Sequence, residues 1–208
     1  MLDVQRLACV RGDRALFRHL EFCLPAGHLL RVTGRNGSGK TSLLRILCGL
    51  SQPDAGTVLW HGQVIAEQRD VFHGRLLYLG HSPALNDLLT PVENLRFACQ
   101  ASGDDFTHGD CIDSLKHIGL DRELELPCKV LSQGQRRRVA LARVFLAAHR
   151  PLWLLDEPFT ALDKHAIGEL ASTLDAHCAR NGSVVITTHQ EVAFAARQES
   201  LSMEAFAA

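Results

Sequence analysis

One segment of eight residues restricts the possible folds of this chain more than any other. Residues 34–41 read GRNGSGKT and match the phosphate-binding pattern GxxxxGK[ST]. The pattern follows an apolar run at 28–33, expected to be a buried strand, and precedes an expected helix at 40–50. Glycines let backbone N–H groups converge on a small anion, and a helix N-terminus adds partial positive charge. The segment therefore predicts a nucleoside triphosphate site.

The side chains of this segment have distinct expected roles. Lys40 supplies a compact cation for the β- and γ-phosphates, and Thr41 supplies a hydroxyl ligand for Mg²⁺. We expect the nucleotide to be held by Gly34, Arg35, Asn36, Gly37, Ser38, Gly39, Lys40, Thr41 and Ser42.

Two consecutive carboxylates follow another apolar run far along the chain. Residues 152–156 read LWLLD and predict a buried strand that ends in Asp156, with Glu157 next. Asp156 suits Mg²⁺, through water, and Glu157 suits orienting or deprotonating an attacking water. Alone, such a pair would be an ordinary loop. Together with the phosphate-binding segment, the pair predicts a hydrolytic site.

Strands alternate with helices along the chain, which predicts an α/β fold with a largely parallel sheet. The first two strands, separated by Gly12-Asp13, predict a hairpin. Capping residues at Thr90, Ser132, Asp163 and Thr188 predict helix starts, the last of them for a final helix. The stretch 84–151 is helix-rich and is expected to be an inserted helical subdomain. Strands are expected at 2–9, 15–24, 28–33, 57–60, 76–79, 152–156 and 183–187.

Composition excludes several classes of protein. The 208 residues hold 22 Lys+Arg against 23 Asp+Glu, so we expect no nucleic-acid partner and no attraction to an anionic membrane. No apolar stretch reaches the roughly 18 residues needed to span a bilayer, and the N-terminus lacks a signal-peptide pattern, so we expect a soluble chain without direct membrane insertion. Seven cysteines lack CxxC spacing and eleven histidines lack HxxxH spacing, which favours reduced core thiols over a metal cluster.

At residues 131–135, LSQGQ, the sequence resembles the signature LSGGQ of the ATP-binding-cassette ATPases. The resemblance covers nearly the whole chain. It implies a RecA-like phosphate-loop core at 1–83 and 152–208, with an antiparallel hairpin region and the helical subdomain at 84–151. It also implies ATP and Mg²⁺ as ligands and a head-to-tail homodimer. In that dimer the γ-phosphate bound by one subunit is contacted by the other subunit's Ser132, Gly134 and Gln135.

The resemblance assigns two further residues and exposes three departures. Asp163 matches the family's loop at the dimer interface, and the same residue is also expected to cap a helix. His189 matches the switch histidine that contacts the γ-phosphate and the attacking water. His81 replaces a glutamine that meets Mg²⁺. Arg11 replaces the aromatic residue that stacks on adenine, and either stacks as a guanidinium or is a solvated turn arginine. Gln133 replaces a signature glycine.

Several stretches also resemble the ATP-binding subunits of the haem exporters of bacterial cytochrome c maturation: 76–83, 89–97, 155–164 and 187–190. This resemblance implies a peripheral subunit at the cytoplasmic face of the inner membrane. There, ATP hydrolysis would drive transfer or release of haem through integral membrane partners. The alternatives are the ATPase subunit of another small exporter and a soluble cassette ATPase outside transport. A phosphate-loop kinase or GTPase would lack the signature.

Overall fold

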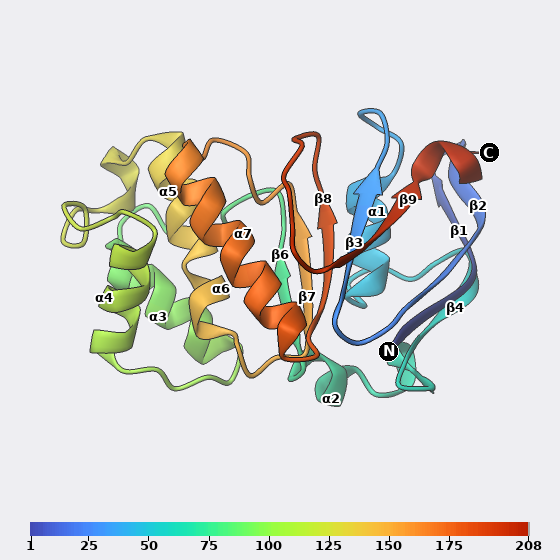
Figure 1. The fold of residues 1–208 in the computed structure, drawn as a ribbon, viewed down its shortest axis with the longest axis horizontal. Coiled ribbons are helices and arrows are strands. Elements are labelled where there is room, and N and C mark those ends of the chain that lie inside the picture. Colours follow the sequence, from blue (N-terminus) through green and yellow to red (C-terminus); the bar gives the residue numbers. More distant parts are fainter. Residues whose placement is uncertain (208) are drawn as a thin grey trace.

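The computed structural model describes residues 1–207 and centres on a parallel sheet. Strands β7 and β8 are buried along their whole length, since helices and a second sheet cover their two faces (Figure 1). Their side chains alternate between two cores: Trp153 and Leu155 face one, Leu152 and Leu154 the other. The strand order is β6 (Leu76–Leu79), β7 (Leu152–Asp156), β8 (Ser183–Thr187), β3 (His28–Thr33) and β9 (Arg197–Ser202).

An antiparallel sheet forms one end of the molecule (Figure 1). The predicted hairpin is present, with Arg11 paired to Arg14 across its turn. Helix α1 (Lys40–Leu47) buries Leu43, Leu44 and Ile46 in the same core as this sheet and one face of the parallel sheet. The strands, in sheet order, are β2 (Arg14–Leu24), β1 (Leu2–Arg11), β4 (Ala55–Trp60) and β5 (Gln63–Val64).

The other face of the parallel sheet packs on helices, which Figure 1 shows at the opposite end of the molecule. Capping boxes at Thr90 and Ser132 are present as predicted, and a third at Thr107 was not predicted. The helix expected from Ser132 to about 148 is two helices. The elements at this end are α3 (Pro91–Ala101), α4 (His108–His117), η2 (Cys128–Val130), α5 (Gln133–Leu141), α6 (Arg143–Leu146) and α7 (Lys164–Ala179). Elsewhere, η1 (Ile65–Glu67) and α2 (Arg69–His73) precede β6, and η3 (Met203–Phe206) follows β9.

The predicted final helix after Thr188 is wrong. Residues 189–196 are irregular, and β9 then pairs in parallel with β3. Asp175 of α7 accepts hydrogen bonds from the backbone N–H groups of Ala195 and Ala196, and Arg31 donates to the Val192 carbonyl at 2.6 Å. These long-range bonds, and the pairing that covers the edge of β3, outweigh the local helix signal.

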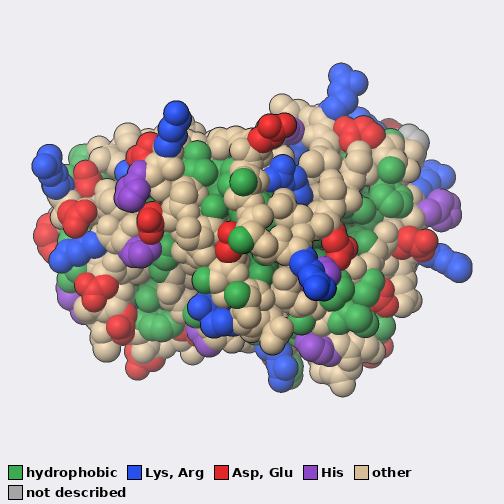
Figure 2. All heavy atoms as spheres, in the orientation of Figure 1, with side chains coloured by type: hydrophobic (Ala, Val, Ile, Leu, Met, Phe, Trp, Pro, Cys, Tyr) green, Lys and Arg blue, Asp and Glu red, His purple; other side chains and the backbone are tan. Residues whose placement is uncertain are grey.

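The surface carries both charge signs. Figure 2 shows Lys and Arg side chains interspersed with Asp and Glu over the face in view, as the near-equal counts of the two kinds lead one to expect. Within residues 1–207, no helix combines the length and the apolar character that crossing a bilayer requires.

Candidate nucleotide-binding site

The phosphate-binding segment and three strand ends line one cavity of about 670 Å³. Because neighbouring parallel strands end at the same edge of a sheet, residues far apart in the sequence meet there. Arg35 and Ser38 line an adjoining cavity of about 700 Å³ instead. The first cavity is lined by Arg11, Leu16, Asn36, Gly37, Gly39, Lys40, Thr41, Ser42, His81, Asp156, Glu157, Thr160 and His189.

Glycine geometry shapes the loop that begins the cavity. Gly39, the N-cap of α1, has φ 100°, a left-handed conformation that side chains rarely adopt. A Cβ at Gly34, whose φ is 151°, would lie 2.6 Å from Oγ of Ser38 and 2.9 Å from Cβ of Met203, so a side chain there would force its neighbours to shift. The loop therefore turns tightly, and the first residues of α1 face the cavity. This arrangement suits a bound phosphate.

Lys40 is held inside the loop. Its Nζ donates to the Gly34 carbonyl at 2.6 Å and to the Arg35 carbonyl at 3.2 Å, and its side chain is largely buried. Nε2 of His189 lies 3.2 Å from the same Nζ. A neutral imidazole with an unprotonated Nε2 accepts a hydrogen bond from the ammonium.

Asp156 is the most buried carboxylate of the site, at 1% exposure. Its Oδ2 accepts from Oγ1 of Thr41 at 2.8 Å, and its Oδ1 accepts from Oγ1 of Thr187 at 2.6 Å. A carboxylate and a hydroxyl are the oxygen donors that Mg²⁺ prefers. Among residues 1–207, no cluster of three or more His, Cys, Asp or Glu side chains is placed to hold a metal ion. The Asp156 carboxylate and the Thr41 hydroxyl supply two oxygen donors of the kind that Mg²⁺ takes, and phosphate oxygens and water would supply the others.

The backbone conformation of Glu157 sets the direction of its side chain. Its φ is 52°, an uncommon value for a residue other than glycine. Its N–H donates to both the hydroxyl and the carbonyl oxygen of Thr187, at 2.8 and 3.1 Å, and these bonds hold the strained conformation. Its carboxylate Oε1 lies 3.5 Å from Nε2 of His189. Sequence reasoning missed Thr187, although a threonine at the end of an apolar strand beside the candidate histidine was a usable signal.

The signature residues lie outside this cavity. The side chains of Ser132 and Gln135 are engaged in the capping box of α5, and Gln135 also donates to Glu123 at 2.9 Å. A Cβ at Gly134 would lie 3.0 Å from the Ala161 carbonyl, so α5 packs closely on the segment before α7. Asp163 caps α7, as predicted, and forms an ion pair with Arg138 of α5.

His81 and Arg11 lie at the cavity wall. His81 is exposed, and its backbone carbonyl accepts from Arg137 at 2.9 Å. Arg11, at the end of β1, places Nη2 at 3.5 Å from Oγ of Ser51. Because Arg11 and Leu16 both line the cavity, a nucleotide base between them would meet a guanidinium and an apolar side chain.

A glycine-bent loop between β3 and α1, its lysine, and an acidic pair at the end of β7 define a phosphate-loop nucleotide hydrolase. Residues 17–160 also match the family model described as ABC transporter. The chain belongs to the ABC transporter family, as an ATP-binding and ATP-hydrolysing subunit.

Two relatives carry the name "Cytochrome c biogenesis ATP-binding export protein CcmA". The one from Aromatoleum aromaticum is 58% identical over 100% of this chain and 97% of its own length. The one from Escherichia coli O157:H7 is 46% identical over 91% of this chain and 89% of its own length.

Solved structures share the fold at lower identity. A putative ABC transporter ATP-binding protein from Pyrococcus furiosus has a TM-score of 0.83 at 21% identity, covering 100% of this chain and 99% of its own. The ATP-binding cassette MJ0796, solved as a dimer with ADP and Pi, has a TM-score of 0.79 at 23% identity, covering 91% and 88%. These structures confirm the predicted fold class, and the family model confirms the expected membership of the cassette ATPases.

Proposed function

We propose that the chain is the ATPase subunit of a cytochrome c biogenesis exporter, where ATP hydrolysis drives transfer or release of haem. The observation that carries this proposal is the 58% identity, along the entire chain, to a protein named as the ATP-binding export protein of cytochrome c biogenesis. We also assign 84–151, which contains α3 to α6, as a helical subdomain inserted into a core formed by 1–83 and 152–208.

Five side chains of the cavity carry the proposed chemistry. Lys40 binds the β- and γ-phosphates. The Thr41 hydroxyl and Asp156 hold Mg²⁺, which neutralises phosphate charge when bound. Glu157 orients the attacking water and takes its proton, and His189, close to both Lys40 and Glu157, contacts the γ-phosphate. His81 is an exposed third candidate for the Mg²⁺ shell. The remaining contacts to ATP come from Gly34, Arg35, Asn36, Gly37, Ser38, Gly39 and Ser42.

Hydrolysis needs two copies of the chain in this proposal. Ser132 is exposed and Gly134 and Gln135 are half-buried at the start of α5, outside the cavity of their own chain. In this proposal they contact the nucleotide held by a partner copy. The dimeric solved cassette with the same fold supports this arrangement. Asp163 then lies at the interface between the copies.

Integral membrane subunits are the remaining proposed partners, which places the chain at the cytoplasmic face of the bacterial inner membrane. The balanced charge gives no reason to expect direct attraction to lipid or nucleic acid.

Deletion of the gene for this chain in its own bacterium tests the role. We expect haem staining to show no c-type cytochromes, and expect the wild-type chain, but not Lys40→Ala, to restore them. Normal c-type cytochromes in the deletion strain would contradict the role and favour another small exporter or a soluble ATPase.

A further inference from the structure

A single buried arginine outside the predicted site joins two of its loops. Arg137, in the second turn of α5, is 6% exposed. One guanidinium nitrogen, Nη1, donates to the backbone carbonyls of Gly80 and His81, both at 2.9 Å. The other, Nη2, donates to the carbonyls of Asp156 at 2.6 Å and Glu157 at 3.0 Å.

The strand register explains why one side chain reaches both loops. Strands β6 and β7 pair in parallel, with Leu79 opposite Leu155. Gly80, directly after β6, and Asp156, the last residue of β7, therefore lie side by side where these strands end near the cavity. A planar guanidinium carries two N–H groups on each of its two terminal nitrogens, so each nitrogen can serve one loop, whereas a lysine ammonium has a single nitrogen and cannot reproduce this geometry.

The cost of burying this charge indicates more than packing. Burial lowers the pKa of the Arg137 guanidinium, while the negative charges of Asp156 and Glu157 oppose that shift. Its Nε is buried without a hydrogen-bond partner. The four carbonyl bonds offset part of this cost, and an apolar residue at this position would leave the four carbonyls without that donor.

We propose that Arg137 is a positioning residue for hydrolysis: it fixes the separation between the loop that carries His81 and the loop that carries Glu157, and ties both to the helix that begins with the signature. The proposal rests on the proposed roles of Glu157 and of the signature segment. It predicts that loss of the bridge lowers turnover without weakening nucleotide binding, because the hydrogen bonds of Arg137 go to other loops than the phosphate-binding loop.

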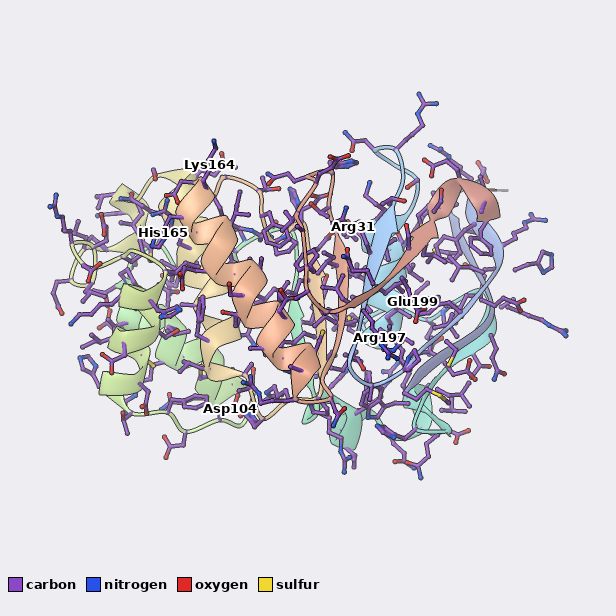
Figure 3. The ribbon with its side chains drawn as sticks, in the orientation of Figure 1. Arg31, Asp104, Lys164, His165, Arg197 and Glu199 are labelled. Carbon is purple, nitrogen blue, oxygen red and sulfur yellow. The ribbon has the colours of Figure 1, made fainter. Side chains whose placement is uncertain are left out.

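The chain offers a matched control at the other end of β6. Arg150 is 4% exposed and donates to the carbonyls of His73 and Leu76 and to Asp104. Figure 3 labels Asp104 at the edge of the molecule where the parallel strands begin, opposite the edge where Lys164 and His165 start α7. Arg150 is thus an equally buried clamp, remote from the cavity.

The test compares Arg137→Lys with Arg150→Lys, each retaining its positive charge. We measure ATPase kcat and KM, the Kd of a fluorescent ATP analogue, thermal unfolding, and amide hydrogen exchange at 79–82. For Arg137→Lys we expect kcat at least about tenfold lower, Kd within about threefold, and faster exchange at 79–82. For Arg150→Lys we expect a comparable fall in Tm with kcat within about twofold and unchanged exchange at 79–82.

Two outcomes would overturn the proposal. Wild-type kcat in folded Arg137→Lys overturns the proposal, as does an equal loss of kcat in the two variants at equal loss of Tm. If Arg137→Lys does not fold, Arg137→Gln is measured in the same way and carries the same expectations. The variant Glu157→Gln separates the proposed site from the role of Arg137. If Glu157→Gln keeps full activity, the proposed site is wrong. If Glu157→Gln is inactive while Arg137→Lys turns over like the wild type, only the role of Arg137 is wrong.

Discussion

Nζ of Lys40 lies 3.2 Å from Nε2 of His189, although 149 residues separate them in the sequence. The same imidazole nitrogen is 3.5 Å from the Glu157 carboxylate. One histidine therefore contacts both the proposed phosphate-binding cation and the proposed base. This geometry gives Lys40 and His189 different expected roles, because only Lys40 belongs to the phosphate-binding loop.

Substituting these two residues should separate binding from turnover. We expect Lys40→Ala to weaken ATP binding by about 10–100-fold, since it removes a charge-assisted hydrogen bond to phosphate. We expect His189→Ala to bind ATP within a few-fold of wild type and to lose about 100-fold in kcat. Equilibrium binding and steady-state ATPase assays measure both. Unchanged kcat in His189→Ala would remove this residue from the hydrolytic step.

Thr187 should matter for both stability and turnover. It is fully buried and donates to Asp156 at 2.6 Å while accepting from the Glu157 N–H at 2.8 Å. Thr187→Val keeps the shape of the side chain but leaves Oδ1 of Asp156 without this hydrogen-bond donor. We therefore expect the free energy of unfolding to fall by about 1–3 kcal/mol and kcat to be reduced. Urea denaturation measures the first effect. Thr187→Ser retains the hydroxyl and should keep most of the kcat.

Arg11 should contribute to base binding. Because it lines the cavity beside Leu16, we expect Arg11→Ala to raise the Kd for ATP by about three- to tenfold. Arg18→Ala removes the same charge from an exposed position of β2 and serves as the control. Equal affinities for the two variants would show that Arg11 is a solvated turn residue. Arg11→Tyr, which supplies an aromatic ring, should bind at least as tightly as the wild type.

His177 should make stability fall in mild acid. Its ring stacks on Trp153 at 3.7 Å between centroids, and burial lowers its pKa to about 4. The folded state then binds fewer protons than the unfolded state between pH 6.5 and 4, so stability is retained above pH 6.5 and lost as the pH falls. We expect this residue to account for about 3 kcal/mol of the loss between pH 7 and pH 4. Urea denaturation across this range should show a shallower slope for His177→Phe, and equal slopes would contradict the assignment.

The parts of the structure that sequence reasoning predicted are those with local signals. The loop at 34–41 carries its function in residue order, and the capping boxes at Thr90 and Ser132 are read from residues three apart. Strand β9 was mistaken for a helix, because pairing with β3 is a long-range interaction that no local pattern reports. Arg137 was missed for the same reason: its acceptors lie 19 to 57 residues away.

Turnover and ATP binding of Glu157→Gln test the central claim most directly. Glutamine keeps the size of the side chain but cannot take a proton from water. We predict that purified Glu157→Gln binds ATP with near wild-type affinity, loses about 100-fold or more in kcat, and elutes as a dimer with ATP present, while the wild type does not accumulate in that form. Wild-type turnover by Glu157→Gln would contradict the proposed site, and full wild-type activity in a demonstrably monomeric preparation would contradict the shared sites.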